Sequence, residues 1–368
     1  MKKQITALAL GTIILTGSLI GCTKKDNNDK PSTDFETMQA NALNDFVNIV
    51  GNPVYAQFKL EAGHLKEAVH TLAGNPTVAN QTAAKNAWRA VRVTWEQSEG
   101  FLIGPVEDDN YDPYMDTWPT DHNAMQALLN SSTPLTVEQL EGYDNPDNET
   151  QLTLRGFHPL EFLLWGASGN RDANYTQREK EYMTALADDI YNNVSNLQQS
   201  WLPSGGDFAR EITDAGQSNS RYTSKKDILK ALASVLSDIC SEVGESKMLN
   251  PYAPQPDSTI TESPYSHNSI IDFRNNIIGA YQVYTCSYND QKGTSLSDIV
   301  AANNKTLDAE IKQKFTTALN SFDGITTTYE QAVYTQRSQI QNTLNALAAL
   351  KETLDNKLIP YFDQYIKD

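Results

Sequence analysis

Apolar side chains recur at intervals of three and four residues along most of this chain. That spacing puts them on one face of an α-helix, where they can pack against neighbouring helices. The pattern is clearest in five segments: residues 35–50, 182–201, 228–243, 307–322 and 340–358. Sustained alternation of apolar and polar residues, the pattern of a half-buried strand, does not occur in the sequence. The sequence therefore predicts an all-α protein with a bundle-like architecture.

Three irregular stretches, rich in Pro, Gly, Asp, Asn and Ser, separate these helices. They cover residues 104–121, 202–220 and 244–268. The middle stretch divides the body nearly in half, so we expect two helical-bundle domains packed side by side, residues 34–203 and 204–368. Long loops in compact helical proteins often carry function, which draws attention to the first and third stretches.

The first residues have the pattern of a bacterial lipoprotein signal. Two lysines follow the initiator methionine, an apolar run covers residues 5–20, and a glycine precedes Cys22. A small residue before the cut is expected of a secretory signal, so we expect residues 1–21 to be removed and Cys22 to carry lipid. Residues 22–33 are polar and charged, which is typical of a flexible tether. These features predict a lipid-anchored protein of the cell envelope, held in the outer membrane on its periplasmic or surface face.

Composition narrows the choice of partners. The chain carries 46 acidic side chains against 29 from Lys and Arg, a formal net charge of −17. A nucleic acid requires a basic face, so we expect no nucleic-acid partner. Besides Cys22, the chain contains Cys240 and Cys286. These two can pair in an oxidising envelope or stay as buried thiols in apolar helices, and the sequence leaves both alternatives open.

Candidate chemistry begins with His158 and Glu161, which stand three residues apart where a helix is expected to begin. Side chains at that spacing lie on one helical face. Imidazole and carboxylate are ligands for zinc, copper and iron, so the pair could share a metal ion. The alternative is a capping box, in which Pro159 opens the helix, His158 is the cap and Glu161 reaches back to a free backbone N–H. Spacing alone does not choose between them.

Acidic residues near the first irregular stretch are further candidates. Glu99 and Arg92 flank the apolar stripe of a helix expected over about residues 82–103. A carboxylate so close to an apolar face needs a partner, which could be Arg92, an imidazole or a metal. The loop that follows carries Asp116 and Trp118 among prolines and other acids, and it could either wall a cleft or serve as a packed connector.

The third stretch leads through Ser266 and His267 into a helix expected to begin near residue 270. Ser269 and Asp272 have the spacing of a capping pair. Asp272 also belongs to a polar stripe beside the apolar face of this helix, so the helix is not purely part of the core.

Together these residues resemble the imelysin family, also called the insulin-cleaving membrane protease family. The family hallmark is a Gly-x-His-x-x-Glu motif, which stands here as Gly156-x-His158-x-x-Glu161. The other matching segments are residues 162–166, Trp88, Glu99-x-Phe101-x-x-Gly104-Pro105-Val106 and Asp116-x-Trp118-Pro119. The resemblance covers the chain from about residue 34 to its end, including residues 263–284.

The resemblance implies two all-helical, bundle-like domains in or exported to the Gram-negative envelope, with the motif near the domain interface. It also implies a link to iron acquisition, because related periplasmic components of iron uptake use the His-x-x-Glu pair as metal ligands. His158 and Glu161 are then the first metal-site candidates and Glu99 is the next. The weaker candidates match family segments without an assigned role: Asp116, Trp118, Ser266, His267 and Asp272.

Three functions remain open from the sequence. A binding protein would capture a transition metal, iron or zinc, or an iron-containing ligand, for uptake with an outer-membrane transport partner. A zinc-type metallopeptidase would need a third ligand, for which Glu99, His267, His64 and His122 are candidates, and a general base. A metal-free module binding a peptide or polymer is the third. We expect capture, because it needs the fewest parts.

Overall fold

The computed structural model describes residues 33–145 and 147–367. The predicted signal, Cys22 and the predicted tether up to residue 32 lie outside the described residues. In the first half of the described chain, all regular secondary structure is helical, and loops connect the helices. Its elements are α1 (Thr33–Asp45), η1 (Phe46–Gly51), α2 (Asn52–Gly74), α3 (Val78–Ser98), η2 (Glu99–Phe101), α4 (Pro105–Asp108), α5 (Tyr111–Asp116), α6 (His122–Asn130), α7 (Val137–Glu141), α8 (Glu149–Leu152), α9 (Phe157–Trp165), α10 (Gln177–Trp201) and α11 (Phe208–Thr213).

The second half is helical except for one short hairpin of two-residue strands. Its elements are α12 (Lys225–Ser241), η3 (Glu242–Lys247), α13 (Leu249–Tyr252), η4 (Ser258–Ile260), α14 (Ser269–Thr285), β1 (Ser287–Tyr288), β2 (Gln291–Lys292), α15 (Leu296–Asn303), α16 (Lys305–Phe322), α17 (Tyr329–Thr335), α18 (Arg337–Thr353), η5 (Leu354–Leu358) and α19 (Ile359–Tyr365). The all-α class predicted from the spacing of apolar residues is therefore confirmed.

Helix boundaries follow local sequence signals. The Thr176 side chain accepts from the backbone of Glu179 and the Glu179 carboxylate accepts in return, which forms a capping box at the start of α10. Ser224 and Asp227 start α12 in the same way. The five segments with helical spacing all lie in helices of the described chain, some continued by a short π-helical turn.

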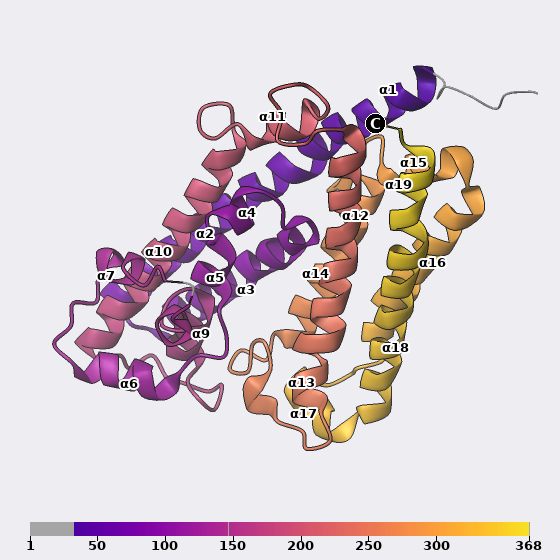
Figure 1. Ribbon diagram of the computed structural model, residues 1–368. Coiled ribbons are helices and arrows are strands. Elements are labelled where there is room, and N and C mark those ends of the chain that lie inside the picture. Colours follow the sequence, from indigo (N-terminus) through magenta and orange to yellow (C-terminus); the bar gives the residue numbers. More distant parts are fainter. Residues whose placement is uncertain (1–32, 146, 368) are drawn as a thin grey trace, which may run out of the picture.

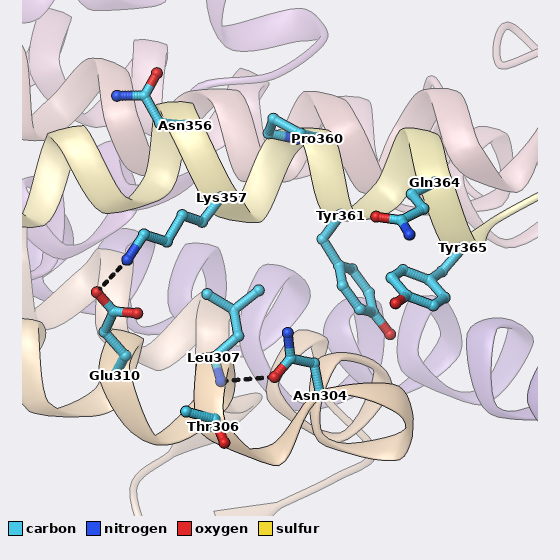
Figure 2. Close-up of a pocket in the computed structure, with 10 residues that line it drawn as sticks. All are labelled: Asn304, Thr306, Leu307, Glu310, Asn356, Lys357, Pro360, Tyr361, Gln364 and Tyr365. Atoms are coloured by element: carbon cyan, nitrogen blue, oxygen red, sulfur yellow. Dashed lines mark hydrogen bonds and ion pairs between the residues drawn. The ribbon is translucent and has the colours of Figure 1, made fainter.

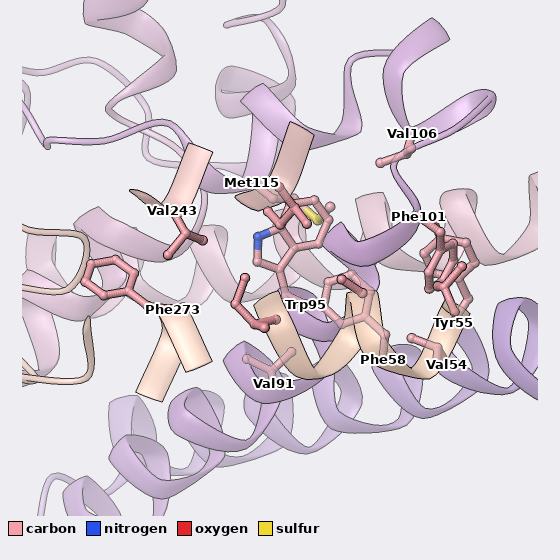
Figure 3. Close-up of a cluster of buried hydrophobic side chains, with 14 of the residues drawn as sticks. Val54, Tyr55, Phe58, Val91, Trp95, Phe101, Val106, Met115, Val243 and Phe273 are labelled. Atoms are coloured by element: carbon pink, nitrogen blue, oxygen red, sulfur yellow. The ribbon is translucent and has the colours of Figure 1, made fainter. Parts of the chain in front are cut away.

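Two groups of helices lie beside each other (Figure 1). In the first half α2 packs against α3 and α10, and in the second half α12, α14, α16 and α18 pack together. Helix α14 also packs along α3 and η2, so it joins the two halves. Buried apolar side chains of both halves form one connected cluster, which includes Trp95 and Met115 from the first half and Val243 and Phe273 from the second (Figure 3). The predicted domain division near residue 203 therefore stays a prediction.

Two glycines allow α14 to approach the first half closely. A Cβ atom on Gly100 would overlap the backbone of Gly279, and one on Gly279 would overlap the carbonyl of Gln97. Backbone therefore meets backbone at this junction, which only glycine permits without a shift. The C-terminal end of α3 therefore lies close to the middle of α14, and polar residues of the two helices meet in the interior.

Two further expectations concern the described residues. Cys240 and Cys286 are both buried free thiols, so the disulfide alternative is wrong. Burial raises the pKa of the Cys286 thiol to about 12, which keeps it protonated and unreactive. Within the described ranges, no helix has the length and apolar character needed to cross a bilayer.

Candidate metal centre

The motif helix α9 begins differently from the sequence prediction. Gly156 is the cap residue of α9, with φ of 83°, so no side-chain hydrogen bond caps the start of this helix. A Cβ atom there would overlap the backbone carbonyl of Met115 at the end of α5. Glycine is therefore required twice, for the positive φ and for the close approach. Because α5 lies directly on the start of α9, Asp116 comes to rest beside His158.

His158 is buried and faces carboxylates through both ring nitrogens. Its Nε2 lies 2.9 Å from Oδ1 of Asp116 and 4.0 Å from Oε1 of Glu262. Its Nδ1 lies 3.5 Å from Oε2 of Glu161 and makes no hydrogen bond. An imidazole between three carboxylates from separate segments is an arrangement that a helix cap does not need.

Glu161 reaches across the molecule rather than back to its own helix. Its Oε1 accepts hydrogen bonds from the backbone N–H groups of Tyr265, at 3.1 Å, and Ser266, at 2.7 Å. Its Oε2 is buried without a hydrogen-bond donor. The capping-box alternative is therefore wrong for His158 and Glu161. The carboxylate instead fixes the loop that precedes α14 and leaves one oxygen turned towards the imidazole.

Arg92 of α3 is the central cation of this cluster and is fully buried. Its guanidinium contacts the carboxylates of Glu96 and Asp116, lies 2.8 Å from Glu262 and approaches Asp272 to 3.7 Å. Of the partners left open for Glu99 by the sequence, Arg92 is not the one that the structure shows. Arg92 instead draws together acids from α3, α5 and the segment around α14.

Glu99 has a different partner, contributed by the second half of the chain. The ammonium of Lys247 lies 3.2 Å from Oε2 of Glu99, and the amide of Asn276 donates to the same oxygen. Lys247 is itself almost completely buried and also faces Glu262, at 3.6 Å. Glu99 therefore belongs to the same polar cluster as His158, at its opposite end.

The cluster holds more acids than cations. Its six buried carboxylates are Glu96, Glu99, Asp116, Glu161, Glu262 and Asp272. Among the described residues, Arg92, Lys247 and, when protonated, His158 pair with these acids, and Arg89 interacts electrostatically with Glu161 and Asp272. Buried charge is costly unless it is paired or bound to a metal. The surplus must therefore be met by protons or by a bound cation.

The acids respond to this environment in opposite directions. Burial would raise the pKa of Asp116, but the Arg92 guanidinium and the bond from His158 hold it well below its usual range. Burial raises the pKa of Glu262 to about 8 despite the attraction of Lys247. For His158, burial lowers the pKa, yet the hydrogen bond to Asp116 and the nearby Glu161 carboxylate outweigh this and raise it to about 9. Surplus acids thus hold protons that a metal ion could replace.

Two groups of side chains offer ligand atoms close enough to share an ion. Asp116, His158 and Glu262 form the first, with all three atoms within 4.8 Å of one another. The second is formed by Glu99, Asp112 and Asp116, so Asp116 belongs to both. Imidazole with carboxylates suits iron, zinc or manganese. Oε1 of Glu262 faces His158 and accepts from Arg92, while its buried Oε2 makes no hydrogen bond and lies 3.6 Å from Lys247.

Comparison with known proteins identifies relatives of this chain. The model of the imelysin family, peptidase M75, matches residues 51–356. The chain belongs to the imelysin family. A curated relative, "Iron-regulated protein A" of Synechococcus elongatus, is 28% identical over 320 residues, which cover 86% of this chain and 84% of that protein.

Two solved structures share the imelysin fold. An iron-regulated protein A precursor from Parabacteroides distasonis is 24% identical with a TM-score of 0.81, covering 91% of this chain and 97% of its own. An imelysin-like protein from Psychrobacter arcticum is 16% identical with a TM-score of 0.69, covering 89% of this chain and 96% of its own. At these identities the likeness shows the fold alone.

Some residues of the predicted imelysin site lie outside the cluster. The His267 ring is 45% exposed and faces Glu330 at 3.5 Å, so it is not beside His158. Ser266 contributes its backbone to Glu161, while its buried hydroxyl has no hydrogen-bond partner. Trp118 is half-buried, and no hydrogen bond of its side chain to the cluster is found within the described residues. His122 instead contacts the hydroxyl of Tyr265.

Asp272 belongs to the cluster, but not through a helix cap. Asn268 is the cap residue of α14 and makes no side-chain cap bond. Asp272 accepts hydrogen bonds from the Ser263 hydroxyl, at 2.6 Å, and from the Asn268 amide, at 2.7 Å. The Ser269 hydroxyl bonds to Glu330 instead. The predicted capping pair is therefore wrong, and Asp272 stands in the polar interior.

Four members of the cluster were missed by the sequence analysis: Glu96, Lys247, Glu262 and Asn276. Glu96 stands four residues after Arg92 on one helical face, and that spacing could have identified it. The other three come from the second half and reach the cluster only through the packing of α14 against α3. Asn276 follows Asp272 by four residues on the polar stripe of α14, whereas no local pattern marks Lys247 or Glu262.

A separate groove lies between α16 and the C-terminal helix α19 (Figure 2). Its volume is about 300 Å³, and it is bordered by the stacked rings of Tyr361 and Tyr365. An ion pair of 2.6 Å between Lys357 and Glu310 crosses it. None of its lining residues belongs to the polar cluster, so it is not a candidate for metal binding.

Proposed function

We propose that this member of the imelysin family is an envelope lipoprotein that binds a transition metal ion, foremost iron, for uptake. His158, Asp116 and Glu262 are the ligands in this proposal, and Glu161 orients the imidazole from its other side. One observation carries the proposal: three ligand atoms converge within 4.8 Å in a buried cluster whose acids outnumber its cations. A cation there would relieve the surplus of negative charge.

Iron is the preferred metal for two reasons. The ligand set combines one imidazole with carboxylates and contains no thiolate, which suits iron and manganese as well as zinc. The curated relative bears the name "Iron-regulated protein A", and the alignment covers most of both chains. Together these support an iron-related role, with zinc as the competing ion.

A zinc-type metallopeptidase is the second candidate function. Imidazole nitrogen and carboxylate oxygen are both zinc ligands, and a catalytic zinc has three protein ligands and an open position, a number that this group could supply. Turnover would also require access for a peptide carbonyl. His158 is 2% exposed and Glu262 is 0% exposed, and Arg92 already contacts both acids of the set. This enclosure favours capture over peptide hydrolysis.

Metal titration of the full chain, purified in mild detergent, tests the proposal. We expect about one Fe²⁺ or Zn²⁺ per chain, and we expect His158→Ala to weaken binding at least tenfold, or about 1.4 kcal/mol. The matched control is His70→Ala, because this exposed histidine bonds to Asp188 away from the cluster and Lys66 shares that acid. Absence of binding heat and of thermal stabilisation by either ion would overturn the metal-binding proposal. A peptide-library digest then separates the two functions, since cleavage that disappears in His158→Ala would favour the peptidase.

The lipid anchor is part of the same proposal and has its own test. Cys22 would carry the lipid, and residues 22–33 would connect it to α1, which begins at Thr33. Growth with labelled palmitate should label the wild type, and Cys22→Ser should lose the label and move to the soluble fraction. Unchanged membrane association of Cys22→Ser would contradict the anchor.

A further inference from the structure

Lys247 is the least expected member of the polar cluster. It is the last residue of η3, and its side chain is 3% exposed although it ends in a charge. Its Nζ lies 3.2 Å from Glu99, 3.2 Å from Glu242, 3.6 Å from Glu262 and 3.9 Å from Glu96. Four carboxylates from three separate segments thus surround one ammonium group.

These four carboxylates are continuous with the proposed metal site. Glu262 faces both His158 and Lys247, at 4.0 Å and 3.6 Å. Glu99 faces Lys247 and also belongs to the second group of ligand atoms, with Asp112 and Asp116. The lysine therefore stands inside a set of acids large enough for more than one cation.

Unpaired oxygen atoms point to cation binding at the lysine end. Oε2 of Glu262 is fully buried, makes no hydrogen bond and lies 3.6 Å from the ammonium. Asn276 donates its amide N–H groups to Glu96 and Glu99, and its own buried Oδ1 has no hydrogen-bond donor. Amide and carboxylate oxygens without donors are ligands that hard divalent ions prefer.

We propose that Lys247 holds the place of a second metal ion and thereby limits the cluster to one. An ammonium is a compact point charge, so it can balance acids that a divalent ion would otherwise bridge. Carboxylates that project inward from facing helices hold paired ions in di-iron and di-manganese bundle proteins. Asp116 belongs to both groups of ligand atoms, and Glu262 faces both His158 and Lys247. The ligands of the second position would be Glu99, Asp112 and Asp116, with Glu262 freed by loss of the lysine. Glu242, whose side chain is 42% exposed, provides contact with solvent at this end.

The inference rests on the proposed function, and one titration separates the two. The full chain in detergent is titrated with Mn²⁺ as wild type and as Lys247→Met, which keeps an unbranched side chain without the charge. We expect the ratio of bound ion to chain to rise from about one to about two. In the variant, the electron paramagnetic resonance spectrum should show two exchange-coupled Mn²⁺ ions. The control Lys230→Met removes an exposed ion pair with Asp363 and should leave the ratio at the wild-type value.

Each outcome has a distinct meaning. One ion in both proteins would overturn the inference and leave the proposed function intact. No ion in the wild type and one in Lys247→Met would support the lysine as a stand-in cation but overturn the proposed function. If Lys247→Met does not fold without metal, Lys247→Gln serves as the second variant. Refolding of either variant by excess Mn²⁺ supports the inference, and failure of both to refold with Mn²⁺ overturns it.

Discussion

Two buried arginines of this protein have contrasting surroundings. Arg155 binds Asp189 through two parallel hydrogen bonds of 3.0 and 2.7 Å, and it donates another to the Tyr143 carbonyl. Asn193 donates to the same Asp189 carboxylate. One cation meets one anion, with additional donors and acceptors close by. Arg92 instead contacts four carboxylates, in a cluster where several oxygens have no donor.

The difference separates structural from functional buried charge. A balanced, bidentate pair with extra hydrogen bonds can hold two elements together without anything further. A buried surplus of one charge raises the free energy of the folded state unless a proton or an ion relieves it. The surroundings of Arg155 are therefore explained by the link between α10 and the loop before α9. Those of Arg92 require a ligand or protons.

The largest effect is expected from breaking the balanced pair. Asp189→Ala leaves the Arg155 guanidinium buried without its anion, which should lower the free energy of unfolding by about 3–5 kcal/mol. Because no metal is involved, the loss should be the same with and without Fe²⁺ or Zn²⁺. Urea unfolding followed by circular dichroism measures both values.

The neighbouring residue provides the control. Asp188 is partly exposed and pairs with Lys66 and His70 at the surface, so Asp188→Ala should cost less than about 1 kcal/mol. Equal losses for Asp188→Ala and Asp189→Ala would show that burial of the Arg155 pair is not what matters. A loss in Asp189→Ala that metal restores would contradict the separation of structural from functional charge.

The positions of the helices could be predicted from the sequence because they depend on local spacing of apolar residues. The stripes of α10 and α12 and their capping residues are complete within a few turns of chain. His158 and Glu161 were accessible for the same reason, since three residues separate them. The sequence shows Gly156 as part of a motif but not why glycine is required there, because the reason is the carbonyl of Met115 on another helix.

The rest of the site depends on packing between distant segments. Glu262 and Lys247 reach Arg92 and Glu99 only because Gly100 and Gly279 let α14 approach the first half. The helix-cap interpretations of Glu161 and Asp272 failed for the same reason. Each carboxylate had a plausible local partner, but the structure gives it partners from another segment that local spacing cannot indicate.

An intermediate effect is expected from removing one acid of the surplus. At pH 7 the pKa of Glu262, raised by burial to about 8, favours its protonated form, which glutamine imitates in shape. Glu262→Gln should therefore change the stability of the metal-free protein by less than about 1 kcal/mol. Its metal affinity should fall at least tenfold, or about 1.4 kcal/mol, because a ligand oxygen is lost. Calorimetric titration and urea unfolding measure the two quantities.

Glu310→Gln is the matched control, since Glu310 is partly exposed and pairs with Lys357 away from the cluster. It should leave metal affinity unchanged. A destabilisation of Glu262→Gln as large as that of Asp189→Ala would mean that Glu262 is a structural partner of Arg92. The contrast between the two arginines would then be lost.

The smallest effect is a dependence on pH, and it follows from His158. Burial lowers the pKa of this imidazole, but its hydrogen bond to Asp116 and the nearby Glu161 carboxylate outweigh burial. The pKa is therefore about 9 in the folded protein, against an ordinary value of about 6.5. Its contribution to stability is therefore complete below about pH 6.5 and is lost as pH rises towards 9.

Metal binding has the opposite dependence, because the ion must displace the proton. Between pH 7 and 8 we expect the His158 proton alone to account for about a five- to tenfold rise in Zn²⁺ affinity, while the metal-free protein loses stability. Titrations in buffers of different ionisation enthalpy should show release of about two protons per ion at pH 7, one from His158 and one from Glu262. An affinity independent of pH over this interval would show that His158 is not a ligand, and the surplus acids around Arg92 would then be balanced by protons alone.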